Sequence, residues 1–258
     1  MSVDAPLAEP AIDQALPAPD ARVPPPLPRW IALFEVILVS GIPTQILVAS
    51  VLVFFAGFQY PVTGQVPLSF LAALSLIDTV VVIGLITLFL KLAGERARPI
   101  FLGVRPWRAD ALRGVLFVPV VVIVVALLVL TVRTIAPWTH TVETNPLTLY
   151  LNSPADAAVL LVVAVLAGGV REEMQRAFVL HRFGQYLGGV RVGLVLFTIV
   201  FGALHVDQGI DVAIAVGSLG LWWGLIYIRH RSAVMPMANH AAFNAVQVVQ
   251  AFLARSAG

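Results

Sequence analysis

The feature that most constrains this chain is its set of apolar runs, several of which are long enough to cross a lipid bilayer. The 258 residues are 59% hydrophobic and only 12% charged, and the mean hydropathy is +0.94. Soluble domains contain roughly 45–50% apolar residues, and a helix needs about 20 of them to span the hydrocarbon core. We therefore expect an all-α, polytopic membrane helix bundle.

The apolar runs predict about seven transmembrane helices, within a range of six to eight. The predicted spans cover residues 30–55, 68–90, 111–135, 156–181, 190–205, 210–228 and 233–253. Residues 1–28 are rich in Pro and Ala and have no long apolar stretch, so they predict a disordered tail. Residues 29–150 are then accessory transmembrane helices that precede the part of the chain with polar motifs.

Lys and Arg alternate between the two ends of the predicted spans. The second connection carries Lys91 and five arginines, whereas the first and fifth connections carry no basic residue. The positive-inside rule places the N-terminus and residues 1–28 in the cytoplasm, so we expect a multi-pass protein of the cell (inner) membrane. Because the arginines are scattered over short loops, the net charge of +2 indicates contact with the bilayer and no nucleic-acid partner.

The complete absence of cysteine removes one whole class of chemistry. It excludes disulfides, thiolate metal ligands and a cysteine protease. Any reaction must therefore use carboxylate, imidazole, hydroxyl or amide groups.

Three of the predicted spans carry polar islands within otherwise apolar sequence. These are Glu172, Glu173 and Arg176 on the fourth span, His205 on the fifth, and His240 with Asn244 on the seventh. Helical spacing of four puts Phe201 with His205, and His240 with Asn244, on one helix face each. A single histidine in a helix is more often a packed core residue. Hydrophobic residues would pack a helix bundle without the free-energy cost of burying polar groups. The presence of two histidines, an asparagine and a pair of carboxylates therefore indicates a functional site.

These residue types suit hydrolysis by either of two routes. A buried glutamate can act as a general base toward water, with imidazole and carboxamide groups stabilising the oxyanion of a tetrahedral intermediate. Alternatively, Glu172, His205 and His240 can hold a zinc ion that has an open position for water. The sequence leaves both routes open.

Residues 155–254 resemble the CPBP family of intramembrane endopeptidases, which includes CAAX prenyl endopeptidases and bacteriocin-processing and immunity proteins. That family carries Glu-Glu-x-x-x-Arg, Phe-x-x-x-His and His-x-x-x-Asn motifs in this order on a helical membrane core. Phe201 to His205 and His240 to Asn244 match the last two motifs. The resemblance implies an endopeptidase core whose substrate is a membrane-embedded or membrane-associated protein or peptide. The implied catalytic residues are Glu172, Glu173, His205, His240 and Asn244, with Arg176 and Phe201 supporting them.

The first motif departs from the family spacing, because only Met174 and Gln175 separate Glu173 from Arg176. Adjacent helical positions point about 100° apart, so at most one of the two glutamates faces His205 squarely. Motif order favours Glu172 as the base, with Glu173 turned toward Arg176 three residues later. Pairing of Arg176 with Glu172, four residues before it, would instead leave Glu173 as the freer base. Simple depth counting puts His205 too far from the cytoplasmic side to meet Glu172 unless its span tilts or starts deeper.

Other readings of the same residues stay open. The polar groups also suit an ion-coupled transporter, or a non-catalytic scaffold or immunity protein. Glu35 and Asp78, inside the first two spans, are either paired within the bundle or serve a proton or substrate role. The glycines near the motifs predict close helix packing; they are Gly168, Gly169, Gly188, Gly189 and Gly202. The sequence does not specify the substrate, its prenylation or the oligomeric state.

Overall fold

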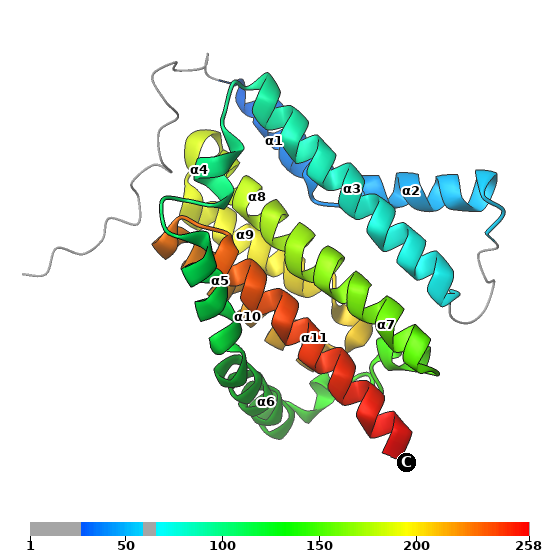
Figure 1. Cartoon of the computed structure of the whole chain (residues 1–258). Coiled ribbons are helices and arrows are strands. Elements are labelled where there is room, and N and C mark those ends of the chain that lie inside the picture. The colour runs from blue at the N-terminus through cyan, green and yellow to red at the C-terminus, as the bar shows by residue number, and fades with distance from the viewer. Residues whose placement is uncertain (1–26, 59–65, 258) are drawn as a thin grey trace, which may run out of the picture.

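Figure 1 shows the computed structural model of the chain, in which residues 27–58 and 66–257 are described. Regular structure in this part of the chain is entirely helical, without a β-strand, so the predicted all-α fold is confirmed. The predicted tail, residues 1–28, lies almost wholly outside the described residues.

The helices have the following bounds. They are α1 (Arg29–Val39), α2 (Ile42–Phe55), α3 (Leu68–Leu92), α4 (Ala97–Phe101), α5 (Trp107–Leu116), α6 (Val118–Ile135), α7 (Pro154–Val163), α8 (Glu172–Tyr186), α9 (Val190–Ala203), α10 (Ile210–His230) and α11 (Val234–Ala257). A π-helical segment, Ala164–Arg171, joins α7 to α8, and a short 3-10 helix, Pro146–Tyr150, lies in the connection between α6 and α7.

Every one of the seven predicted spans contains helix, but they differ in how well they suit a bilayer. Within the described residues, α3, α6, the continuous Pro154–Tyr186 helix and α10 are long and apolar enough to cross a membrane, and the bent pair α1–α2 makes a fifth. Helix α9 is apolar but has only 14 residues. Helix α11 has 24 residues, and its asparagines, glutamines and histidine make it less apolar than the other long helices. The chain is an integral membrane protein.

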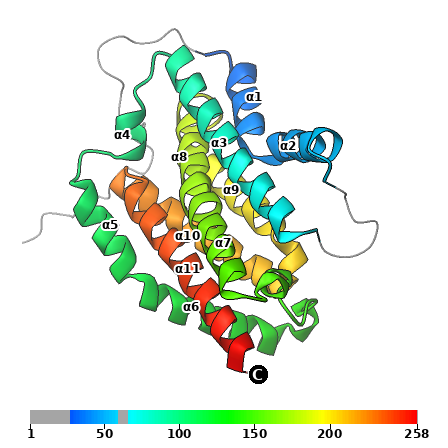
Figure 2. The same ribbon diagram turned by 45° about the vertical axis from the view of Figure 1, so that its right-hand side comes forward.

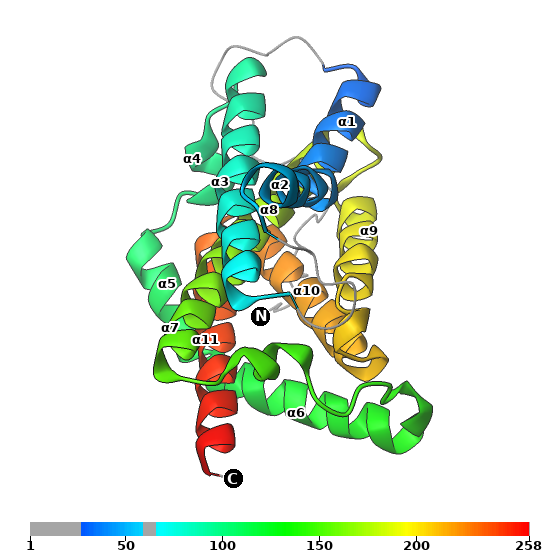
Figure 3. The ribbon, with the colours of Figure 1, turned by 90° about the vertical axis from the view of Figure 1, so that its right-hand side faces the viewer.

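The first predicted span is broken, and the third begins later than predicted. Helices α1 and α2 are bent by 47° at Ser40 and Gly41, where Gly41 has a φ of +87°. The Gln175 side-chain amide donates to the carbonyl of Val39 at 2.6 Å and so satisfies an acceptor that the break leaves free. In the third span the chain changes direction at Phe117, and Pro119 lies in the first turn of α6. Figure 3 shows α6 running across the lower end of the bundle at a steep angle to α3.

Helix α8 is the buried centre of the bundle. In Figures 1 and 2 it lies between α1, α3 and α4 on one side and α9, α10 and α11 on the other, and it packs on all six. Its residues Arg176 to Phe183 are buried without interruption. Phe178 and Leu180 are fully buried in a core with Val82 and Ile86 of α3. A helix buried on every side places its charges out of contact with water, so each of them needs a partner.

Basic residues of this central helix and of the π-helical segment before it pair with acids that precede them in the chain. Arg182 donates from Nε to Glu35 and from Nη1 to Glu95, each at 2.6 Å, and His181 also contacts Glu95. Arg171 pairs with Asp78 of α3. Of the two readings of Glu35 and Asp78, pairing within the bundle is therefore the one observed. These ion pairs tie α1 and α3 to α8.

Candidate active site

The segment that leads to the glutamates is a π-helix, which the sequence did not predict. One stripe of this continuous helix lines a cavity. It starts at Leu160 and continues with pairs of residues that repeat every four positions: Val163 with Ala164, Ala167 with Gly168, and Arg171 with Glu172. In an α-helix a four-residue repeat drifts by about 40° per turn, so wider π turns keep this stripe facing the cavity. The π segment thus delivers Glu172 to the cavity wall.

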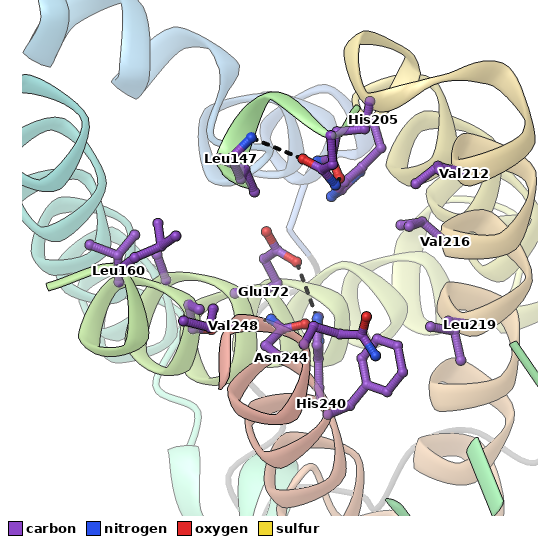
Figure 4. A pocket seen from close by; sticks show the side chains of 18 of the residues that line it. Leu147, Leu160, Glu172, His205, Val212, Val216, Leu219, His240, Asn244 and Val248 are labelled. Carbon is purple, nitrogen blue, oxygen red and sulfur yellow. Dashed lines mark hydrogen bonds and ion pairs between the residues drawn. The ribbon is translucent and has the colours of Figure 1, made fainter. Parts of the chain in front are cut away.

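Glu172 faces the cavity and Glu173 does not. The Glu172 side chain is 18% exposed, whereas that of Glu173 is 1% exposed. Figure 4 shows the Glu172 carboxylate between His205 on one side and His240 with Asn244 on the other. Its Oε2 lies 3.9 Å from Nε2 of His240, and its Oε1 lies 3.5 Å from Arg171. Glu172 is the carboxylate in this pair that a substrate or water can reach.

Glu173 instead holds a buried arginine and a histidine. It forms an ion pair with Arg176, which confirms the predicted pairing at three residues' separation. The Arg176 guanidinium lies between 4.9 and 5.6 Å from the ring centroids of Phe197, Phe201 and Trp223, in cation–π contact with all three. Phe201 therefore supports the site by enclosing Arg176 as well as by contacting His205.

His240 is held from three directions. Its Nδ1 lies 2.8 Å from Oε1 of Glu173, and because a carboxylate accepts, Nδ1 carries the proton. Trp223 stacks on the ring with centroids 3.7 Å apart and planes inclined by 17°. The Trp223 Nε1–H donates to Oδ1 of the neighbouring Asn239 at 2.9 Å, and Asn239 donates in turn to the carbonyl of Gly114 in α5. These contacts aim Nε2 of His240 at Glu172.

His205 lies just beyond the end of its helix, contrary to the predicted helical position. Helix α9 ends at Ala203, and His205 follows in the turn that leads to α10. Its Nδ1 donates to the carbonyl of Phe201 at 2.7 Å, so Nε2 is left as an acceptor in the neutral ring. The predicted depth mismatch does not arise, because α8 extends to Tyr186 and its 15 residues nearly equal the 14 residues of α9 that lead back toward His205. His205 therefore lines the same cavity as Glu172.

Asn244 reaches the site because two glycines allow α11 to approach the π-helix. A Cβ on Gly169 would lie 2.5 Å from Cα of Ala241, and one on Gly168 would overlap the Asn244 amide. Asn244 donates to the carbonyl of Ala164 at 3.2 Å, which uses one of its two N–H groups. The predicted packing role is confirmed for these glycines and for Gly202, whose Cβ would lie 3.0 Å from the Ala213 carbonyl oxygen. It is wrong for Gly188 and Gly189, which, among the described residues, have open space around them and a positive φ in the α8–α9 turn.

The four residues Glu172, His205, His240 and Asn244 line one cavity of about 520 Å³. Its walls come from α3, α6, α7, α10 and α11 and from the connection that contains Pro146–Tyr150. Most of the lining is aliphatic. The size and the few convergent polar groups are typical of a ligand site.

The same residues do not form a metal site in this arrangement. Across residues 27–58 and 66–257, no three His, Asp or Glu side chains are placed to hold one ion. Glu172 and His240 approach each other, but His205 is not close enough to complete a set with them. The donor set predicted for zinc therefore does not fit the structure as it stands.

Residues 154–246 match the protein-family model described as type II CAAX prenyl endopeptidase Rce1-like. Over these 93 of its 258 residues, the chain is similar to that family. The Rce1-like segment contains all five predicted catalytic residues and both supporting residues, and it runs from the start of α7 into α11. Neither the curated proteins nor the solved structures include a significant match to the chain.

Two residues around the Rce1-like site were missed by the sequence analysis. Trp223 stacks on His240 and donates to Asn239, which precedes His240 in the chain. Asn239 carried a weak signal, as a polar residue next to His240 in a predicted span. Trp223 carried none, because its partners lie on another helix. Asp78 was noted as an acid within an apolar span, but its partner Arg171 lies on another helix and could not be identified from the sequence.

Proposed function

We propose that the protein is an intramembrane endopeptidase that hydrolyses a peptide bond of a membrane-embedded or membrane-associated protein or peptide. The observation that carries the proposal is the placement of Glu172 in one cavity with His205, His240 and Asn244, while Glu173 is withdrawn into an ion pair. The match to a protease family supports the reaction class.

In this proposal Glu172 is the general base. Its carboxylate takes a proton from water, which His205 orients through its free Nε2, and the water oxygen attacks the carbonyl carbon of the substrate. The carbonyl oxygen becomes an oxyanion and accepts from the remaining N–H of Asn244. It also accepts from Nε2 of His240 when both nitrogens of that ring carry protons. Glu172 then returns its proton to the leaving amine, which restores the carboxylate.

The second glutamate has a positioning role in this scheme. Glu173 fixes the His240 ring through Nδ1, and Arg176 neutralises Glu173 inside its aromatic enclosure. A carboxylate committed to an arginine is a poor base, which supports assigning proton transfer to Glu172.

The orientation in the membrane belongs to the same proposal. With the Lys and Arg-rich connections in the cytoplasm, the α8–α9 turn faces the cytoplasm and the connection from α6 to α7 faces the other side. Aqueous access to the cavity is then from the side of the residue 136–153 connection, which contributes Asn145 and Leu147 to the cavity wall.

The test is an assay of the full-length protein in lipid nanodiscs against membrane peptides that accumulate in cells lacking it. Glu172→Gln is expected to abolish turnover while the protein stays folded and binds substrate. Glu143→Gln, at an exposed position that does not line the cavity, is the matched control and should retain full activity. Full activity in Glu172→Gln with loss in Glu173→Gln would reverse the assignment. A cellular phenotype that survives both changes would instead indicate a non-catalytic scaffold.

A further inference from the structure

Away from the catalytic residues, the cavity offers a substrate almost no charge. Among the described residues that line it, the only charged side chains besides histidine are Glu172 and Arg171. The rest of the wall is aliphatic or aromatic, with a few hydroxyl and carboxamide groups. A substrate segment that fills this space loses its contact with water on several sides.

Arg171, the cationic side chain among the described lining residues, already has an ionic partner. Arg171 is 8% exposed and pairs through Nη1 with the fully buried Asp78, and its Nη2 lies 3.5 Å from Glu172. It is therefore not available to neutralise the carboxylate at the end of a bound peptide. An anionic substrate group in this cavity would stay unpaired, which is costly, and a cationic group would find only the carboxylate of Glu172, the base of the proposed reaction.

Two carboxamides have hydrogen-bonding capacity left over. Gln208 follows His205 by three residues, and its Oε1 accepts from Asn145 at 3.0 Å, so its Nε2–H groups remain to donate. Gln247 lines the cavity one turn beyond Asn244, and within the described structure its side chain makes no hydrogen bond. One carboxamide thus lies near each side of the catalytic group.

We infer that the substrate is an uncharged apolar segment, cleaved internally and held in extended form through its main chain by Gln208 and Gln247, without recognition of a chain terminus. The inference rests on the proposed function and specifies its substrate class. A carboxamide both donates and accepts, which matches the N–H and C=O groups of a peptide whatever its side chains.

The spacing along α11 agrees with an extended chain. Asn244 and Gln247 are separated by about 4.5 Å of helix rise, and an extended peptide advances about 3.3 Å per residue. A peptide that runs along α11 with its reacting carbonyl at Asn244 therefore presents a main-chain group to Gln247 one or two residues away. Val248 and Ala251 continue the same stripe and provide an apolar surface for the following side chains.

The experiment uses the full-length protein in nanodiscs and one internally quenched peptide of Leu, Ala, Val and Ser. The peptide is made with a C-terminal carboxylate, with a C-terminal carboxamide, and with Lys or Asp beside the bond that mass spectrometry identifies as cleaved. We expect the carboxylate and carboxamide forms to have kcat/KM values within about twofold of each other. We expect Lys or Asp to lower kcat/KM by on the order of 100-fold, because Asp is buried without a partner and Lys pairs with Glu172, the proposed base.

The protein variants test the main-chain contacts. Gln247→Leu is expected to raise KM by roughly three- to tenfold, the range for one hydrogen bond, with kcat nearly unchanged. Gln250→Leu is the matched control, since Gln250 is exposed on the same helix but does not line the cavity, and it should leave both constants unchanged.

Each outcome separates the inference from the proposed function. If amidation of the peptide's C-terminus abolished cleavage, the enzyme would recognise a chain terminus and that part of the inference would be wrong. An unchanged KM in Gln247→Leu would overturn the main-chain contact. If the wild type cleaved none of these peptides but cleaved accumulated membrane peptides, the substrate class would be wrong while the endopeptidase function stood. Cleavage of neither set would reject the proposed function and this inference together.

Discussion

Trp223 lies flat against His240, with ring centroids 3.7 Å apart, while its indole N–H is bound to Asn239, the residue that precedes His240 in the chain. The same tryptophan therefore fixes both the imidazole plane and the backbone position from which it projects. Through Asn239 and the carbonyl of Gly114, this arrangement also anchors α5, which lies outside the Rce1-like segment.

Replacing Trp223 should lower turnover more than binding. Trp223→Leu removes the stacked ring, and a displacement of about 1 Å in a catalytic group can cost about 100-fold, so we expect kcat to fall by roughly 10- to 100-fold with little change in KM. Trp223→Phe keeps a ring beside His240 but leaves Asn239 without its donor, and it should give an intermediate kcat. Trp222→Phe, on the neighbouring position, is the control. A KM effect equal to the kcat effect in Trp223→Leu would argue for a substrate contact instead of positioning.

The Asp78–Arg171 pair should behave as a buried ion pair in a double-mutant cycle. Asp78→Leu and Arg171→Met each leave one buried charge without a partner, and we expect each to lower the free energy of unfolding by about 3–5 kcal/mol. The double variant should lose less than the sum, because neither charge remains. Thermal unfolding in detergent measures this, with Arg229→Met at an exposed position as the control. Simple additivity of the two losses would mean that the two side chains do not interact.

Glu95 should contribute to an acid-sensitive stability. Burial raises the pKa of its carboxyl, but the hydrogen bonds and charges of His181 and Arg182 outweigh burial and hold the pKa below its ordinary value of 4.5. A carboxyl with a lowered pKa in the folded state stabilises the fold above its ordinary pKa and loses that contribution as the pH falls through the lower, folded-state value. The melting temperature of the wild type should therefore drop more steeply below pH 4.5 than that of Glu95→Gln.

The control for this pH series is Glu143→Gln, which removes an exposed carboxyl and should keep the wild-type slope. If the melting temperatures of wild type and Glu95→Gln fell equally steeply below pH 4.5, other carboxyls would account for the loss of stability in acid. At neutral pH, Glu95→Gln should already be less stable than the wild type, because Arg182 then keeps only Glu35 as an ionic partner.

Single cysteines can establish the orientation, since the wild type has no thiol of its own. If the N-terminus is cytoplasmic, an impermeant maleimide should label Glu143→Cys in intact cells and should label Ala97→Cys only after lysis. Both positions are exposed. Gly94 is a poorer choice for the inner position, because its φ of +70° would strain a cysteine. Labelling of Ala97→Cys in intact cells would invert the proposed topology.

The sequence by itself determined what depends on composition and on neighbours along one helix. Apolar runs predicted the helices because runs of that length have few other stable structures in lipid. The pairing of Glu173 with Arg176 followed from the motif order of the resembled family together with a three-residue spacing. The three polar islands followed from the cost of placing such groups in apolar spans. Their order along the chain was enough to indicate a hydrolytic site and a family resemblance.

Only the tertiary structure decided which groups from different helices meet. Two contacts join residues that no local spacing relates. Trp223 stacks on His240, and Asp78 pairs with Arg171, the cationic side chain of the cavity wall. The π turns and the early end of α9 were equally out of reach, because each depends on packing against neighbouring helices. Local periodicity sets which face of a helix a residue occupies, but the partner on that face is set by how the helices pack in three dimensions.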